Sequence, residues 1–151
     1  MLPHLTAKTK TMKKLLIAVA ALCVAAAIPA AQATPPKREM RGVWVSTHIS
    51  LDWPNRTQTP AQQRAALLGI LDHNKATGMN AAFLQVRSQS DAMYPSTLEP
   101  WSYYLTNQQG AAPVPAWDPL QFAIDESRKR GLEFHAWINP YRAVATLANA
   151  G

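Results

Sequence analysis

The strand that decides the fold of this chain lies at residues 131–139, which read GLEFHAWIN. Its apolar residues alternate with polar or amphipathic ones, the apolar set being Leu132, Phe134, Ala136 and Ile138 and the other set Glu133, His135, Trp137 and Asn139. Successive side chains of a strand point to opposite faces, so we expect the apolar set to pack under helices. The other set should then face a barrel interior or a ligand crevice.

The segment at residues 80–87 predicts a second strand of the same kind. It alternates Ala82, Leu84 and Val86 with Phe83, Gln85 and Arg87. Strands of an ordinary parallel sheet are buried on both faces and form continuous apolar runs. Polarity here rises toward the carboxyl end of each strand, where barrel enzymes place their active sites. A polar barrel interior without catalysis remains the alternative.

Two helices are predicted between the strands, and a first strand is expected over residues 42–47. Thr59-Pro60-Ala61-Gln62 combines a capping residue, a proline suited to the first helical position and a capping-box glutamine. Asp118-Pro119-Leu120-Gln121 repeats the pattern, and Gly78 and Gly131 end the two helices. The order β-α-β-α-β favours parallel strands joined by crossovers.

A basic cluster, residues 128–130, fills the last turn of the second helix. We interpret it as cations that complement the helix C-terminus, in preference to a phosphate or nucleic-acid site.

The connection from Ser88 to Trp117 is long for a compact domain, and no helix is predicted in it. A stretch of this length without secondary structure is either a working loop or a sign that the assignment is wrong. It contains the aromatic residues Tyr94, Trp101, Tyr103 and Tyr104, and Trp117 closes it. These rings are suited either to the apolar faces of sugars or to packing the loop against itself.

The amino-terminal residues have the pattern of a secretory signal. Four lysines precede an apolar run over residues 15–28, and Ala31-Gln32-Ala33 offers small residues for cleavage. The apolar run is shorter than the roughly 20 residues that span a bilayer. We therefore expect a signal peptide at 1–33, a linker at 34–39, cleavage after Ala33 and no stable membrane span. The localisation expected is the bacterial periplasm or cell envelope, and lipid attachment at Cys23 is the alternative.

The net charge of +6 is concentrated in that signal. Beyond Ala33 there remain eleven Lys and Arg against nine Asp and Glu, a net charge of +2. So small an excess does not imply a nucleic-acid partner. Cys23 is the single cysteine, so the mature chain has no disulfide. His135 has no second ligand at a known metal-binding spacing, so neither a metal nor a cofactor is predicted.

Three segments together resemble a known family. They are Met40–Thr47 with Leu51-Asp52-Trp53-Pro54, then Phe83–Arg87 with Ser90–Ser96 and Glu99–Ser102, then Trp117–Leu120 with Lys129–Arg142. In this order they resemble the opening of the glycosyl-hydrolase-like family ten, exported bacterial proteins of which some are lipoproteins acting on peptidoglycan. The acidic "FDDY"-like motif of a later strand in that family does not occur here.

The resemblance implies an α/β fold, a TIM-type (β/α)8 barrel. Residues 40–151 would be its N-terminal part, with only the first three strands and two helices present. It further implies hydrolysis of β-linked cell-envelope glycans, with peptidoglycan as the expected partner. Two carboxylates normally flank the scissile bond, one as acid and one as nucleophile or base.

The expected substrate-binding residues are those of the polar strand faces and the following loops: Arg87, Asp91, Trp101, His135, Trp137, Asn139, Tyr141 and Arg142. Asp52 and Asp91 are the carboxylates near the expected mouth. Asp91 is the catalytic candidate, with the orientation of Arg87 as its alternative role, and the main pair is expected beyond Gly151. Glu133, at the start of its strand, is expected to form an internal salt bridge.

Three strands cannot close the barrel that eight require. We therefore expect this chain alone to be inactive and poorly soluble, with its third strand an exposed edge. Two alternatives stay open: a non-catalytic glycan-binding protein, and an inactive truncated gene product.

Overall fold

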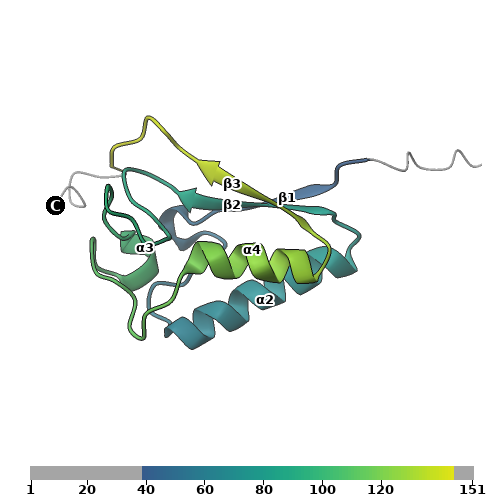
Figure 1. The fold of residues 1–151 in the computed structure, drawn as a ribbon, viewed down its shortest axis with the longest axis horizontal. Helices are drawn as coiled ribbons and strands as arrows, with labels where there is room; N and C mark the ends of the chain where they lie inside the picture. The colour runs from purple at the N-terminus through teal and green to yellow at the C-terminus, as the bar shows by residue number, and fades with distance from the viewer. Residues whose placement is uncertain (1–38, 145–151) are drawn as a thin grey trace, which may run out of the picture. The chain divides into compact units, whose positions relative to one another are not determined.

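The computed structural model describes residues 39–144 (Figure 1). These residues belong to one compact unit that begins at Glu39. The expected signal peptide and its cleavage site lie outside the described residues, and so do residues 145–151.

Three parallel strands form the sheet: β1 (Gly42–Val45), β2 (Ala81–Arg87) and β3 (Glu133–Ile138). They stand in the order β1-β2-β3, so the β-α-β-α-β succession and the parallel pairing are confirmed. The first strand ends at Val45, earlier than expected, because the backbone N–H groups of the next residues donate to side chains instead of to the backbone of β2. Ser46 N donates to Asp52 Oδ2 and Thr47 N donates to Gln85 Oε1.

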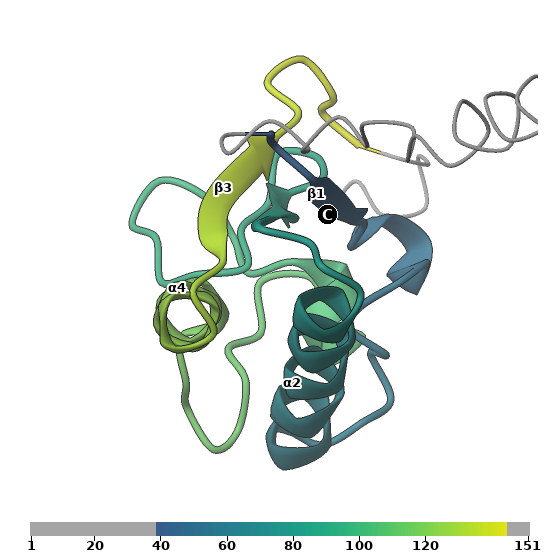
Figure 2. The ribbon, with the colours of Figure 1, turned by 90° about the vertical axis from the view of Figure 1, so that its right-hand side faces the viewer.

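The two main helices begin where the capping motifs predict. In α2 (Pro60–Ala76) the Thr59 side chain accepts from Gln62 N, and Gln62 Oε1 accepts from Thr59 N, which completes the capping box. In α4 (Pro119–Lys129) the Asp118 side chain caps Gln121 N. Figure 2 shows α2 and α4 side by side on one side of the sheet.

The helix-covered face is the predicted one in β2, but the prediction is wrong for the end of β3, because no described element covers Ala136 and Ile138, which is 47% exposed. Ala82, Leu84 and Val86 are each at most 2% exposed and share a core with Leu67 and Leu71 of α2. Val45 of β1 and Ala123 of α4 belong to the same core, and Phe134 packs against it. Burying a leucine of this kind stabilises a fold by about 1.5–3 kcal/mol.

The opposite face of the sheet is aromatic. Trp44 stacks on Phe83 at 4.7 Å between ring centroids, and Phe83 stacks on His135 at 4.4 Å. The three residues are register partners on β1, β2 and β3. Trp44 is 59% exposed within this structure. We call this row of three rings the open face.

The connection between β2 and α4 contains a short helix that the sequence did not predict, α3 (Tyr103–Thr106). Ser102 caps it by accepting from Tyr104 N, and Asn107 ends it in the left-handed conformation. Tyr104 and Leu105 form a small second core with Met93, so the loop is packed largely by its own side chains. One turn of helix is too short to give a periodic sequence pattern.

The basic cluster at the end of α4 also ties the two helices together. Arg130, just past the helix, pairs with Asp72 of α2 and with Glu126 of α4 at 2.6 Å each. The sequence indicated cations at a helix end, and the structure adds the specific carboxylates. Within residues 39–144, no helix combines the length and apolar character that a membrane crossing needs.

Candidate functional site

The carboxyl ends of the three strands point to the same edge of the sheet (Figure 1). Three segments follow them there: the 3-10 turn η1 (His48–Ser50) after β1, the long connection after β2, and residues 139–144 after β3. In a parallel α/β sheet this edge is where ligands bind. We call the residues gathered at it the strand-end cluster.

Gln85 holds the first of these segments in place. Its Oε1 accepts hydrogen bonds from Thr47 N and His48 N, each at 2.9 Å, and the side chain is 1% exposed. The backbone beyond it is strained, since Ile49 and Ser50 have φ of 51° and 56°. A non-glycine residue in this region costs about 1–3 kcal/mol and persists only where its surroundings enforce it. Gln85 supplies part of that enforcement.

Asp91 is the buried carboxylate of the cluster, with 1% exposure. Its Oδ1 accepts from Gln89 N at 3.2 Å, whereas Oδ2 is buried and has no hydrogen-bond partner among the described residues. A buried carboxylate with an unmatched oxygen is costly unless a positive charge or a donor completes it. Among the described charges, Arg142 and Asp91 act on the same two neighbours, His48 and Tyr104.

His48 and Tyr104 lie edge to face, with 5.6 Å between ring centroids. Burial lowers the pKa of His48 from its ordinary value of 6.5, and Arg142 lowers it further, against an opposing effect of Asp91. Burial also raises the pKa of Tyr104, although a backbone hydrogen bond from Ile49 acts in the other direction. At neutral pH the imidazole and the phenol are therefore both uncharged.

Arg87 does not pair with Asp91. Its guanidinium forms an ion pair with Glu99 of the long connection, and both side chains are largely buried. The strand alternation also breaks at this point, because a register shift after Gln85 pairs Arg87 with Ile138. Glu99 therefore orients Arg87, the role that the sequence analysis considered for Asp91.

Trp137 and Asn139 come together as expected. Trp137 Nε1 donates to Asn139 Oδ1 at 2.9 Å, and Asn139 Nδ2 donates to Ser88 O at 3.1 Å. This chain of hydrogen bonds links the end of β3 to the start of the loop after β2. It fixes the orientation of the indole at the strand ends.

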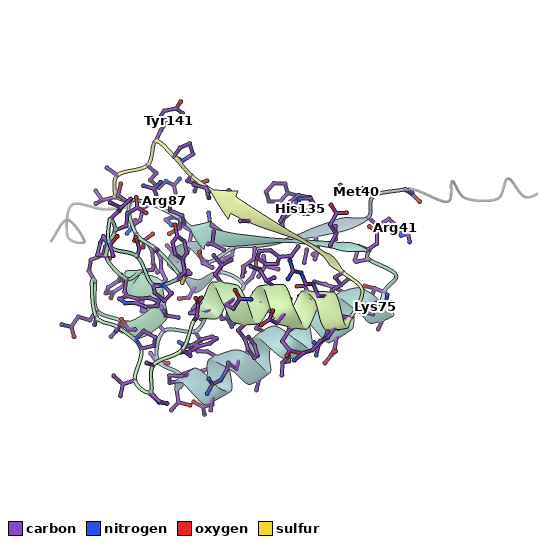
Figure 3. All side chains as sticks on the ribbon, viewed as in Figure 1. Met40, Arg41, Lys75, Arg87, His135 and Tyr141 are labelled. Atoms are coloured by element: carbon purple, nitrogen blue, oxygen red, sulfur yellow. The ribbon has the colours of Figure 1, made fainter. Side chains whose placement is uncertain are left out.

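His135 lies farther back along the sheet, away from Arg87 (Figure 3). It belongs to the open face, where it stacks on Phe83, and its Nε2 is 3.1 Å from Glu133 Oε1. The contact that the sequence analysis expected for Glu133 is thus with His135, an ion pair only when the imidazole is protonated. His135 is on the predicted face but not at the strand ends.

The two remaining expected residues have different surroundings. Trp101 packs against the second core beside Met93 and Tyr104. Tyr141 is 99% exposed at the tip of the segment after β3 and points away from the sheet (Figure 3).

Asp52, the other carboxylate near the mouth, is occupied structurally because its Oδ2 accepts from Ser46 N at 2.7 Å. Among residues 39–144, no three His, Cys, Asp or Glu residues are placed to hold a metal ion.

The structure brings together three residues that the sequence analysis did not choose: His48, Tyr104 and Glu99. His48 follows β1 directly, so its place after a strand was a signal that could have found it. Tyr104 and Glu99 lie within a long connection whose path follows from tertiary packing alone.

The fold and the cluster define a class of protein. A parallel α/β sheet carries buried polar and charged side chains at the carboxyl ends of its strands, the arrangement of α/β enzymes and ligand-binding proteins. A family model fixes the class more closely: glycosyl hydrolase-like 10 matches residues 39–149. The chain belongs to this family, as its sequence resemblance indicated.

Curated relatives agree with the family. The chain is 45% identical over 106 residues to glycosyl hydrolase YngK of Bacillus subtilis, a match that covers 70% of this chain and 20% of the relative. It is 40% identical over 122 residues to glycosyl hydrolase DigH of Escherichia coli K12, covering 76% of this chain and 27% of the relative. The chain thus spans 20–27% of the length of these relatives.

Proposed function

We propose that the full-length protein hydrolyses β-linked glycans of the bacterial cell envelope, with peptidoglycan as substrate, in a TIM-type barrel. The observation that carries this proposal is the strand-end cluster around Asp91 in a chain of the glycosyl hydrolase-like 10 family. Its relatives are named glycosyl hydrolases, which supports the reaction class.

The described residues account for one side of such a site. Asp91 has a buried oxygen without a hydrogen-bond partner among the described residues, which would need to become accessible for a sugar hydroxyl to reach it. Trp137 offers an indole whose orientation is fixed by Asn139. Glycoside hydrolysis needs two carboxylates. Since Asp52 and Glu99 are engaged elsewhere, we place the main catalytic pair on later strands and assign Asp91 to substrate binding.

The test is release of reducing ends from purified peptidoglycan by the full-length protein. Asp91→Asn should lower kcat/KM by at least about tenfold, because it removes a charged hydrogen-bond acceptor that is buried at the strand ends. Asp52→Asn is the matched control, since an amide oxygen can still accept from Ser46 N. Binding of glycan without any hydrolysis would support the non-catalytic alternative instead.

We also propose export, with cleavage after Ala33. The basic, apolar and Ala-x-Ala order of residues 8–33 supports it. Sequencing of the mature N-terminus from a periplasmic extract should begin at Thr34. An uncut cytoplasmic chain would contradict the proposal, and a lipidated Cys23 would favour the lipoprotein.

A further inference from the structure

Two hollows lie beside the strand-end cluster, on the surface of the loop that follows β1. One, of about 280 Å³, is lined by Ile49, Ser50 and residues 55–57. The other, of about 420 Å³, lies between residues 56–60 and the segment from Leu105 to Val114. Arg56 and Thr57 line both, so the two hollows adjoin at these residues.

The larger hollow is held open by structure that does not depend on a ligand. Gln63 of α2 is 1% exposed, and its Nε2 donates to Asn55 O at 3.1 Å and to Leu105 O at 2.8 Å. One side chain therefore fixes both walls. Asn55 Oδ1 accepts from Thr57 N at 3.0 Å and from Thr57 Oγ1 at 2.8 Å, which sets the turn that carries Arg56.

Among residues 39–144, Arg56 is the one charged residue in the lining of either hollow. Its guanidinium carbon lies 5.1 Å from the centroid of the Tyr103 ring. No ion pair joins Arg56 to a carboxylate among residues 39–144. A guanidinium that lies over a ring face still has N–H groups that can bind a carboxylate bidentately.

The remaining polar groups suit a sugar. Thr57, Gln58 and Gln108 surround the hollows with hydroxyl and amide groups, which donate to and accept from hydroxyl groups. A single cation matches one carboxylate better than it matches a polyanion, because a polyanion requires several positive charges along its length.

We propose that these hollows form a subsite for a carboxylate-bearing sugar residue, with Arg56 binding the carboxylate. The inference rests on the proposed glycan hydrolysis, since it names the substrate class for the same mouth. Tyr104 connects the two regions, because its ring centroid lies 5.6 Å from that of His48 and 5.7 Å from that of Tyr103, over which Arg56 lies. A glycan that passes from the strand ends over Ile49 would reach Arg56 next.

The experiment measures binding to the full-length protein by calorimetry with paired probes. The first probe is a β-linked amino-sugar tetrasaccharide carrying lactyl carboxylates, and the second is the same tetrasaccharide with these groups reduced to alcohols. A tetrasaccharide of uronic acids tests the other source of a sugar carboxylate. Arg56→Ala should weaken binding of the acidic lactyl probe by about tenfold or more and leave the reduced probe unchanged.

Arg64→Ala is the matched control. Arg64 is also half-buried, also stacks over an aromatic ring (Trp117, 5.3 Å) and lines neither hollow. The Arg64→Ala variant should bind both probes with the same affinity as the unmodified protein. Arg56→Lys should retain part of the affinity, since it keeps the charge and loses the fork. If Arg56→Ala does not fold, Arg56→Gln and Arg56→Lys decide the question.

Two results would overturn the proposal. The first is that the Arg56 variants bind the acidic lactyl probe with the same affinity as the unmodified protein, and the second is that they lose the same affinity for the acidic and the reduced probe. Arg56-dependent binding of the uronic probe alone would retain the site and change its ligand. Failure of the proposed function can be distinguished from failure of the subsite. Arg56-dependent binding without release of reducing ends would refute hydrolysis but support the subsite. Hydrolysis and binding that do not depend on Arg56 would refute the subsite but support hydrolysis.

Discussion

The two faces of the sheet use the same three strands in different ways. The helix-covered face of β2 consists of small and aliphatic residues at most 2% exposed, such as Ala82 and Leu84. The open face is a row of stacked rings whose outermost member, Trp44, is 59% exposed. An apolar surface as large as an indole is rarely left in water without a partner. The difference indicates that the helices cover β2 within these residues but leave the end of β3 uncovered, where Ile138 is 47% exposed, and that the open face is suited to further cover.

The largest expected effect tests whether that difference persists in the full-length protein. If later strands close the proposed barrel, Trp44→Ala should reduce the free energy of unfolding by about 3–5 kcal/mol, as for a buried tryptophan. Urea denaturation measures it. A loss near 1 kcal/mol, the worth of its stacking contacts with Phe83 and Trp137, would show that the open face stays open.

Leu84→Ala probes the helix-covered face and should cost about 2–5 kcal/mol, because it leaves a cavity among Leu67, Leu71 and Val45. Leu98→Ala serves as the control, since Leu98 is 93% exposed and should change little. The same denaturation series measures both. Equal, small losses would mean that this core is not tightly packed.

Arg130→Gln tests the outer side of the helix layer and should have a smaller effect. The neighbouring Lys129 and Arg130 hold the pKa of Glu126 below its ordinary value of 4.5. A lowered carboxyl pKa contributes stability above about pH 4.5, and this contribution is lost as pH falls through the folded-state value. The variant should therefore have a lower melting temperature than the unmodified protein at pH 7, and the difference between the two melting temperatures should narrow below pH 4. The exposed Arg128→Gln should show no such gap.

The smallest expected effect concerns the strand ends. Because the pKa of folded His48 is lowered, its protonation opposes folding. The stability associated with neutral His48 is present above about pH 6.5 and is lost as pH falls through the folded value. The charged neighbours are Arg142, which adds to the lowering, and Asp91, which opposes it. His48→Gln should flatten the decline in melting temperature between pH 7 and pH 5, and an unchanged slope would contradict the assignment.

Much of the fold was determined by the sequence alone. The alternation of residues 80–87 identified the helix-covered face of β2, and the Thr59 and Asp118 capping motifs placed both helix starts. These features are local, since side-chain period and capping chemistry act over a few residues. Family membership likewise followed from three short segments.

The site depended on what the sequence could not reveal. Asp91 and Arg142 were chosen from the sequence, and the place of His48 after a strand could have indicated it. Tyr104 and the pairing of Arg87 with Glu99 emerged only from the path of the long connection. The register shift after Gln85 likewise breaks an alternation that the sequence continues unbroken. The physical reason is the distance along the sequence over which each interaction acts. Strand faces and helix caps are set by neighbours in the chain, whereas the partner of a buried charge is set by whichever distant segment packs beside it.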